Sequence, residues 1–168
     1  DYETKLTKLC HTDLSASNCF SLDLKGLWNV IDVDRGNILL KYWKSSSNQH
    51  IFHYSISSGK LTPLSESGNA TKAFFVAGKA LLLAEDSPEC GGNRCLISID
   101  PRTSKKEIIG LQNVRGHLGD IKPSPDGKSL LVQEAINGID SLWTGKIKDR
   151  KVIPTVANFL SGSNVVWN

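Results

Sequence analysis

The sequence predicts an all-β fold built from β-propeller blades, each made of four antiparallel strands. A short phrase recurs three times, as Gly36-Asn37-Ile38-Leu39-Leu40, Gly78-Lys79-Ala80-Leu81-Leu82 and Gly127-Lys128-Ser129-Leu130-Leu131. Each copy is followed 20 or 21 residues later by an isoleucine that leads into a polar turn, at Ile56, Ile99 and Ile147. The copies lie 42 and 49 residues apart. A repeat of this length, made of short strands and turns, is typical of one propeller blade.

The first strand of each unit precedes the glycine turn, and the second strand follows it. The first strands are expected at Trp28 to Val33, Lys72 to Val76 and Asp120 to Lys122. The second strands are the continuous apolar runs Ile38 to Trp43, Ala80 to Ala84 and Ser129 to Val132. Such runs are typical of strands buried on both faces, as in the inner part of a blade.

A hairpin connection, a third strand, a polar turn and a short outer strand complete each unit. The connections are residues 45–49, residues 86–94 and Asn137-Gly138, and Asn-Gly is a strong hairpin signal. The third strands alternate most plainly in Ile51 to Ile56 and Cys95 to Ile99. The outer strands are expected at Leu61 to Leu64, Glu107 to Leu111 and Val152 to Val156.

We expect complete blades at about residues 25–67, 68–112 and 113–159, with partial blades at 1–24 and 160–168. Two arrangements explain the partial blades. The chain is a fragment of a larger propeller, or Ser163 to Asn168 pairs with the strand near Lys5 to Cys10 and closes a four-bladed ring. We favour the fragment. The expected core comprises Leu39, Leu40, Phe74, Phe75, Leu81, Leu82, Leu130, Leu131 and Trp143.

The third unit carries a motif that resembles known propeller families. Its segment Ser124-Pro125-Asp126-Gly127-Lys128 is similar to the Ser-Pro-Asp-Gly-Lys stretch of WD-repeat and TolB-like propellers. Gly116-His117 and Trp143 lie roughly where WD repeats carry their Gly-His and Trp, whereas Asn137 and Thr144 depart from the WD pattern. The resemblance therefore implies a TolB-like propeller with one strong copy of the repeat and two degenerate ones.

A second resemblance implies a different fold. The stretch Phe20 to Ile31, which contains Gly26-Leu27-Trp28, resembles the N-terminal Gly-x-Trp stretch of lipocalins. Lipocalins are secreted eight-stranded barrels that carry small apolar ligands. Against this alternative, no amphipathic helix is visible near the C-terminus, and the close spacing of Cys90 and Cys95 departs from the long-range bridges of lipocalins.

The four cysteines are predicted to form two local disulfides, Cys10 with Cys19 and Cys90 with Cys95. The members of each pair flank one predicted hairpin loop, which favours the local pairs among the three possible connectivities. A zinc site is the rival interpretation, but Cys-x4-Cys without a nearby pair of histidines supports it poorly. Disulfides indicate an oxidising, extracytoplasmic compartment, either periplasmic or secreted. Asn69-Ala70-Thr71 is an N-glycosylation sequon in a predicted loop.

No catalytic, metal or cofactor site is predicted. The histidines His11, His50, His53 and His117 show no metal-ligand spacing on a shared face. His50 and His53 are three residues apart on one strand, so we expect them on opposite faces of the sheet surface. Asp32 and Asp34 share a face, but they precede a glycine turn, where acidic residues are ordinary turn formers. Neither a Gly-x-Ser-x-Gly elbow nor a phosphate loop occurs.

Composition excludes two classes of partner. The net charge is +3 and its cations are spread among the turns, whereas nucleic-acid binding needs a clustered basic face. No apolar run approaches the ~20 residues of a membrane-spanning helix. The sequence contains no Met, which predicts either a mature processed product or a cut piece.

We therefore expect a non-enzymatic interaction module of an extracytoplasmic protein, which presents propeller loops and edges to a protein or glycan. The expected partner is a separate polypeptide, the rest of the same protein or a second copy, because open sheet edges invite strand pairing. The alternative is the propeller portion of a larger prolyl-oligopeptidase-like enzyme, with catalysis on other sequence. Both expectations rest on fold analogy.

Overall fold

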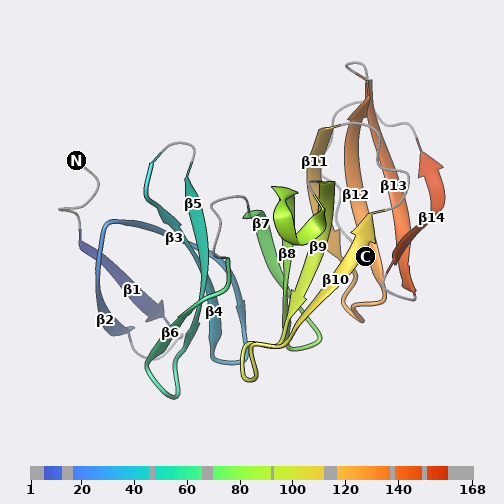
Figure 1. Cartoon of the computed structure of the whole chain (residues 1–168). Helices are drawn as coiled ribbons and strands as arrows, with labels where there is room; N and C mark the ends of the chain where they lie inside the picture. The colour runs from blue at the N-terminus through green and yellow to red at the C-terminus, as the bar shows by residue number, and fades with distance from the viewer. Residues whose placement is uncertain are drawn as a thin grey trace. The chain divides into compact units, whose positions relative to one another are not determined.

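The computed structural model describes residues 6–12, 17–45, 48–65, 70–91, 93–111, 117–136, 139–148 and 151–158. These residues are almost all in β-strands, with one short 3-10 turn, η2 (Pro88–Cys90). The chain divides into two compact units, Asp1–Ala70 and Thr71–Asn168, which are described separately (Figure 1). Within the described ranges, no helix is long and apolar enough to cross a membrane.

Unit 1 contains a two-stranded and a four-stranded antiparallel sheet. Strands β1 (Leu6–Thr12) and β2 (Ser17–Lys25) pair with each other. The second sheet is a meander in the order β3-β4-β5-β6, as Figure 1 shows. Its strands are β3 (Leu27–Asp34), β4 (Asn37–Trp43), β5 (Gln49–Ser55) and β6 (Lys60–Pro63). The chain therefore has the four-stranded hairpin pattern that the repeat predicts.

The first glycine turn explains why β3 and β4 form a tight hairpin. Arg35 and Gly36 both have positive φ, 44° and 80°, which is the backbone conformation of a type I′ turn. Leu39 and Leu40 follow on β4, and both are fully buried although their side chains point to opposite faces of the sheet. The prediction of a second strand buried on both faces is confirmed here.

Unit 2 contains two more meanders. The first comprises β7 (Ala70–Val76), β8 (Lys79–Ser87), β9 (Asn93–Ile99) and β10 (Lys106–Leu111). The second comprises β11 (His117–Pro123), β12 (Ser129–Ile136), β13 (Ile139–Lys148) and β14 (Lys151–Asn158). Their last strands, β10 and β14, pair in parallel through Gly110 with Lys151 and Leu111 with Val152. This pairing links the meanders into one eight-stranded sheet, a connection that the sequence did not predict.

The apolar core of unit 2 draws on both meanders. It contains Phe74, Leu81, Leu83, Leu96, Ile109, Leu118, Ile121, Leu130, Val132, Trp143 and Val152. The predicted core is confirmed at every position except Phe75, which is only half-buried. Phe74 and Phe75 are adjacent on β7, so their side chains point to opposite faces, and the face of Phe74 meets the core.

The first strands of the two meanders are connected by a lysine. The ammonium of Lys72 on β7 donates a hydrogen bond to the carbonyl oxygen of Gly119 on β11. It also lies 3.2 Å from Asp120 Oδ1, and the ammonium of Lys122 lies 3.6 Å from Asp120 Oδ2. The contact joins segments that are 47 residues apart in the sequence.

The Ser124 to Lys128 motif builds the turn between β11 and β12. The Ser124 hydroxyl donates to Asp126 Oδ1 at 2.6 Å, and the Lys128 amide donates to the same oxygen at 3.0 Å. The hydrogen bond from Ser124 lowers the pKa of Asp126. Gly127 closes the turn with φ of 69°. The motif contains Ser124, Asp126 and Gly127 because these residues form the turn.

Several expectations fall on positions outside the described residues. They concern the sequon residue Asn69, the connection Asn137-Gly138, Gly116 of the Gly-His pair, and the proposed closing strand Ser163 to Asn168.

Candidate functional site

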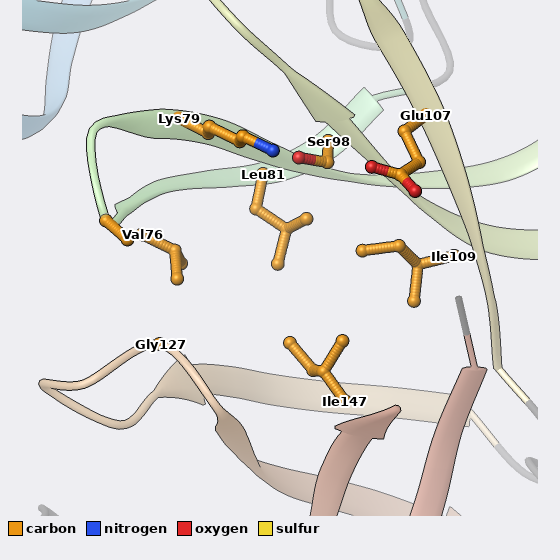
Figure 2. Close-up of a pocket in the computed structure, with 9 residues that line it drawn as sticks. Val76, Lys79, Leu81, Ser98, Glu107, Ile109, Gly127 and Ile147 are labelled. Carbon is orange, nitrogen blue, oxygen red and sulfur yellow. The ribbon is translucent and has the colours of Figure 1, made fainter. Parts of the chain in front are cut away.

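A pocket of about 240 Å³ lies between the two meanders of unit 2. Figure 2 shows aliphatic side chains from both meanders directed into it, with polar groups at one side. Its lining residues are Val76, Ala77, Lys79, Leu81, Ser98, Glu107, Ile109, Gly127 and Ile147.

Strand register explains how one wall of the pocket changes from apolar to polar. Leu81 on β8 pairs with Ser98 on β9, and Ser98 pairs with Glu107 on β10. These three residues form one row across the sheet and point to the same face. The next row on that face is Leu83, Leu96 and Ile109, which belongs to the core. The pocket therefore lies where the core ends and polar side chains begin.

The polar side continues into a second hollow of about 250 Å³. This hollow shares Lys79, Ser98 and Glu107 with the pocket and adds Asp100 and Lys105 from the turn after β9. The two hollows together are called the recess below. It has an aliphatic floor and an outer part that contains two lysines and two acidic residues.

The acidic residues of the recess already have partners. Asp100 Oδ1 accepts the Arg102 amide at 2.9 Å, and this bond lowers the pKa of Asp100. The Arg102 guanidinium also lies 3.7 Å from Asp100. Glu107 has an interaction within the protein as well. By contrast, the described part of the chain offers no hydrogen bond or ion pair to the ammonium groups of Lys79 and Lys105. The recess groups without a partner among the described residues are therefore the ammonium groups of these two exposed lysines.

The opposite wall comes from the second meander. The Ile147 amide donates to the Lys128 carbonyl at 2.9 Å, which holds the end of β13 beside the glycine turn. A Cβ built on Gly127 would overlap Val76 Cγ1, so only glycine lets this turn approach β7 so closely. Gly127 therefore fixes the distance between the two walls.

The sequence predicts two disulfides among the four cysteines, and the structure describes one of them. Cys90 and Cys95 form a disulfide with a Cα–Cα distance of 5.7 Å, between η2 and β9. Cys10 and Cys19 are directly opposite each other in the β1–β2 register, and their side chains lie outside the described parts. Opposed residues of an antiparallel pair are about 4.5–5.5 Å apart, within disulfide range. The Cys10–Cys19 bridge stays a prediction.

Removal of the Cys90–Cys95 disulfide should lower the free energy of unfolding by about 2 kcal/mol, because the bridge restricts a short loop in the unfolded chain. The test compares urea denaturation of the oxidised chain with that of the double variant Cys90→Ser/Cys95→Ser. Because this loop contains no disulfide in the double variant, reductant should not change the unfolding midpoint of the variant through this loop. Equal midpoints for the variant and the oxidised parent would contradict the prediction.

His53 differs from its predicted surface position. It is buried, and its Nε2 lies 2.9 Å from Asn37 Oδ1, to which the Nε2–H tautomer donates. The expectation that both His50 and His53 lie at the sheet surface is wrong for His53, whereas His50 is half-buried. The Asn37 side chain in turn donates to the Asp34 carbonyl at 3.1 Å. This bond between β5 and the first glycine turn was not predictable from the sequence pattern.

Burial lowers the pKa of His53 below 6.5, because the charged imidazolium loses its hydration. The unfolded chain therefore binds this proton more tightly than the folded chain does. The stability that neutral His53 provides is complete above pH 6.5 and is lost as the pH falls through the lower folded pKa. In urea denaturation between about pH 7.5 and about pH 5, His53→Gln should reduce the pH dependence of the free energy of unfolding relative to the parent chain. An unchanged pH dependence for His53→Gln would refute this.

The other polar candidates have structural explanations. Asp32 Oδ1 accepts the neighbouring Val33 amide at 2.8 Å, and Asp34 lies 3.9 Å from the Arg35 guanidinium. Among the residues that the structure describes, no group of three or more His, Cys, Asp or Glu side chains could hold a metal ion.

Trp143 makes a buried hydrogen bond that differs from the WD pattern. Its indole Nε1 donates to Glu134 Oε2 at 3.0 Å, and Glu134 is only 3% exposed. The Ser141 hydroxyl donates to the Glu134 carbonyl at 2.9 Å. Glu134 is the polar partner of this tryptophan, and sequence reasoning missed it because the pairing depends on the β12–β13 register.

Sequence reasoning also missed the recess. Lys79, Ser98 and Glu107 are separated by 19 and 9 residues and share no motif. Only the register of three adjacent strands places Ser98 and Glu107 in one row with Leu81, and Lys79, two residues before Leu81 on β8, shares their face. Alternation in β9 indicates that Ser98 shares a face with Leu96, but it does not reveal that this face opens into a pocket.

Comparison with known proteins addresses the fold. No family model and no curated protein matches the chain. The β-propeller domain of the trilobed protease from Pyrococcus furiosus, which has an open velcro topology, matches 83% of this chain with a TM-score of 0.58 and 12% identity. The chain has a β-propeller fold. It spans 45% of that solved chain and forms an incomplete propeller.

The three four-stranded meanders are thus propeller blades, called the first blade (β3–β6), the second blade (β7–β10) and the third blade (β11–β14). The tricorn protease also matches, over 71% of this chain and 12% of its own, with 12% identity and a TM-score of 0.45. The lipocalin alternative is wrong on strand order. In an up-and-down barrel each strand pairs with its neighbour in sequence, whereas β10 pairs with β14 here.

Proposed function

We propose that this chain is a non-enzymatic binding module of an extracytoplasmic protein and that the recess between its second and third blades receives part of a protein partner. The observation that carries the proposal is the recess itself, which combines an aliphatic floor with unpaired lysines. A concave apolar site with a few convergent polar groups is the usual form of a binding site.

The lining favours a protein partner over a glycan. The floor consists of Val76, Leu81, Ile109 and Ile147, which offer apolar area and no hydrogen-bonding groups. Burial of an apolar side chain on such a floor is favourable, by about 25 cal/mol per Å². A polyhydroxylated sugar would lose hydrogen bonds to water there without replacement. The partner is a separate polypeptide, another part of the same protein or a second copy of the chain.

Two features support the proposed compartment and the proposed group of propellers. The Cys90–Cys95 disulfide favours an oxidising compartment, such as the periplasm or the extracellular space. The Ser124 to Lys128 motif is similar to a stretch of TolB-like propellers, and here its side chains form the hydrogen bonds of a turn within a blade. This combination supports membership of the TolB-like group of propellers.

A peptide-display experiment tests the binding function. Random peptides, presented with free N-termini, as internal loops or with free C-termini, are selected on the immobilised chain and on the variant Ser98→Phe, which fills the recess. We expect at least one presentation to be enriched on the parent chain and not on Ser98→Phe. Circular dichroism establishes that Ser98→Phe is folded. Equal enrichment on both proteins for all three presentations would contradict the proposal.

A second candidate is the propeller portion of a larger prolyl-oligopeptidase-like enzyme. The observation that favours it is the similarity in fold to the propeller domain of the trilobed protease. In this case the catalytic residues lie on other sequence, and the recess contacts peptides on their way to the active site. Selected peptides that the isolated chain binds and leaves uncleaved agree with both candidates. Cleavage by the purified chain would contradict the non-enzymatic assignment.

A further inference from the structure

We propose that the recess recognises the free C-terminal residue of a polypeptide whose last side chain is branched and aliphatic. This inference rests on the proposed binding function of the recess and specifies its ligand. It follows from the size of the pocket, from the balance of charge around it and from the direction of its side chains.

The size of the pocket limits what enters. Its volume of about 240 Å³ is below the 300–1,000 Å³ range of typical small-molecule and cofactor sites. It suits one side chain and the adjoining end of a backbone. Branched aliphatic side chains match the surfaces of Leu81, Ile109 and Ile147, which converge on the pocket in Figure 2.

The two lysines favour a carboxylate as the ligand. Asp100 is engaged by Arg102, and Glu107 has an interaction within the protein. The ammonium groups of Lys79 and Lys105 lack a partner among the described residues. A bound carboxylate would pair with these two ammonium groups, whereas an N-terminal ammonium would meet two cations.

Two hydrogen-bond donors line the polar side of the pocket. Lys79 and Ser98 line both the pocket and the second hollow, and Figure 2 shows both at the side of the pocket away from Ile147. A carboxylate accepts hydrogen bonds from both groups, and bonds that involve two charged partners are the stronger kind. The last side chain then occupies the floor of the pocket.

The second hollow indicates a polypeptide and not a free acid. It has a volume of about 250 Å³, shares Lys79, Ser98 and Glu107 with the pocket, and is also lined by Asp100 and Lys105. The peptide units that precede the last residue would occupy this polar space. A small free acid would leave it empty and would gain nothing from it.

Fluorescence anisotropy with labelled Gly-Gly-Gly-Leu tests the proposal. The peptide with a free carboxylate should bind about tenfold or more tightly than its C-terminal amide, because the amide lacks the charge that Lys79 and Ser98 recognise. Lys79→Gln should reduce the affinity for the free peptide to that for the amide. Lys146→Gln, at an exposed lysine on β13 outside the recess, should leave the affinity unchanged.

Three results would overturn this inference. The amide could bind as tightly as the free carboxylate, Lys79→Gln could have no effect in a folded protein, or N-acetylleucine could bind as tightly as the peptide. The third result would identify a site for single acids. If internal peptides are selected in the display experiment while Gly-Gly-Gly-Leu does not bind, the inference fails and the proposed binding function stands.

Discussion

Replacing Leu130 by alanine should lower the free energy of unfolding by about 2–5 kcal/mol, the range for a large-to-small change in a packed core. Leu130 lies on β12, is fully buried and belongs to the core that the second and third blades share. The loss includes the transfer of apolar surface and the cavity that remains, because packed strands collapse only partly around a missing side chain.

The measurement for Leu130→Ala is urea denaturation of the full chain followed by circular dichroism. Ile108→Ala is the matched control, because Ile108 lies on β10 and is 46% exposed. This control should change the unfolding free energy by less than about 0.5 kcal/mol. Similar effects for the two variants would mean that Leu130 is not in a packed core between blades.

Replacing Gly145 by valine should destabilise the chain by about 3 kcal/mol, because the added atoms overfill the core. A Cβ on Gly145 would lie 2.5 Å from Val152 Cγ1 and 2.8 Å from Trp143 Cζ3. Both neighbours are buried, and the indole of Trp143 is held by its hydrogen bond to Glu134. Neither neighbour can move away without loss of packing.

Lys146→Val is the control for Gly145→Val, since it places the same side chain at the next position of β13, which is exposed. Thermal unfolding should show a clear decrease in melting temperature for Gly145→Val and little change for Lys146→Val. Equal melting temperatures would show that the space beside Gly145 is larger than the structure indicates.

The repeat predicts the blades because each copy contains the glycine turn and the apolar run that form one hairpin. Gly36, Gly78 and Gly127 all adopt positive φ, as tight turns between first and second strands require. The apolar runs that follow contain Leu39, Leu82 and Leu130, all buried. Turn chemistry and periodicity act over a few residues, so a single sequence is sufficient to reveal them.

Contacts between distant strands could not be predicted in the same way. The parallel pairing of β10 with β14 joins residues about 40 positions apart, such as Gly110 and Lys151. The burial of His53 and Glu134 depends on polar partners on neighbouring strands. The recess requires both the register within the second blade and the approach of the third. None of these features leaves a pattern within one segment.

The recess exists only because the second and third blades approach each other closely. This approach is tested most directly by a nuclear Overhauser effect between the Val76 methyl groups and the Gly127 α-protons in the intact chain. Val76 and Gly127 are 51 positions apart in sequence, and the structure places Val76 Cγ1 against Gly127. We expect a strong cross-peak. Its absence, in a spectrum that shows the contact between Leu130 and Gly145 within the third blade, would contradict the packing of the blades.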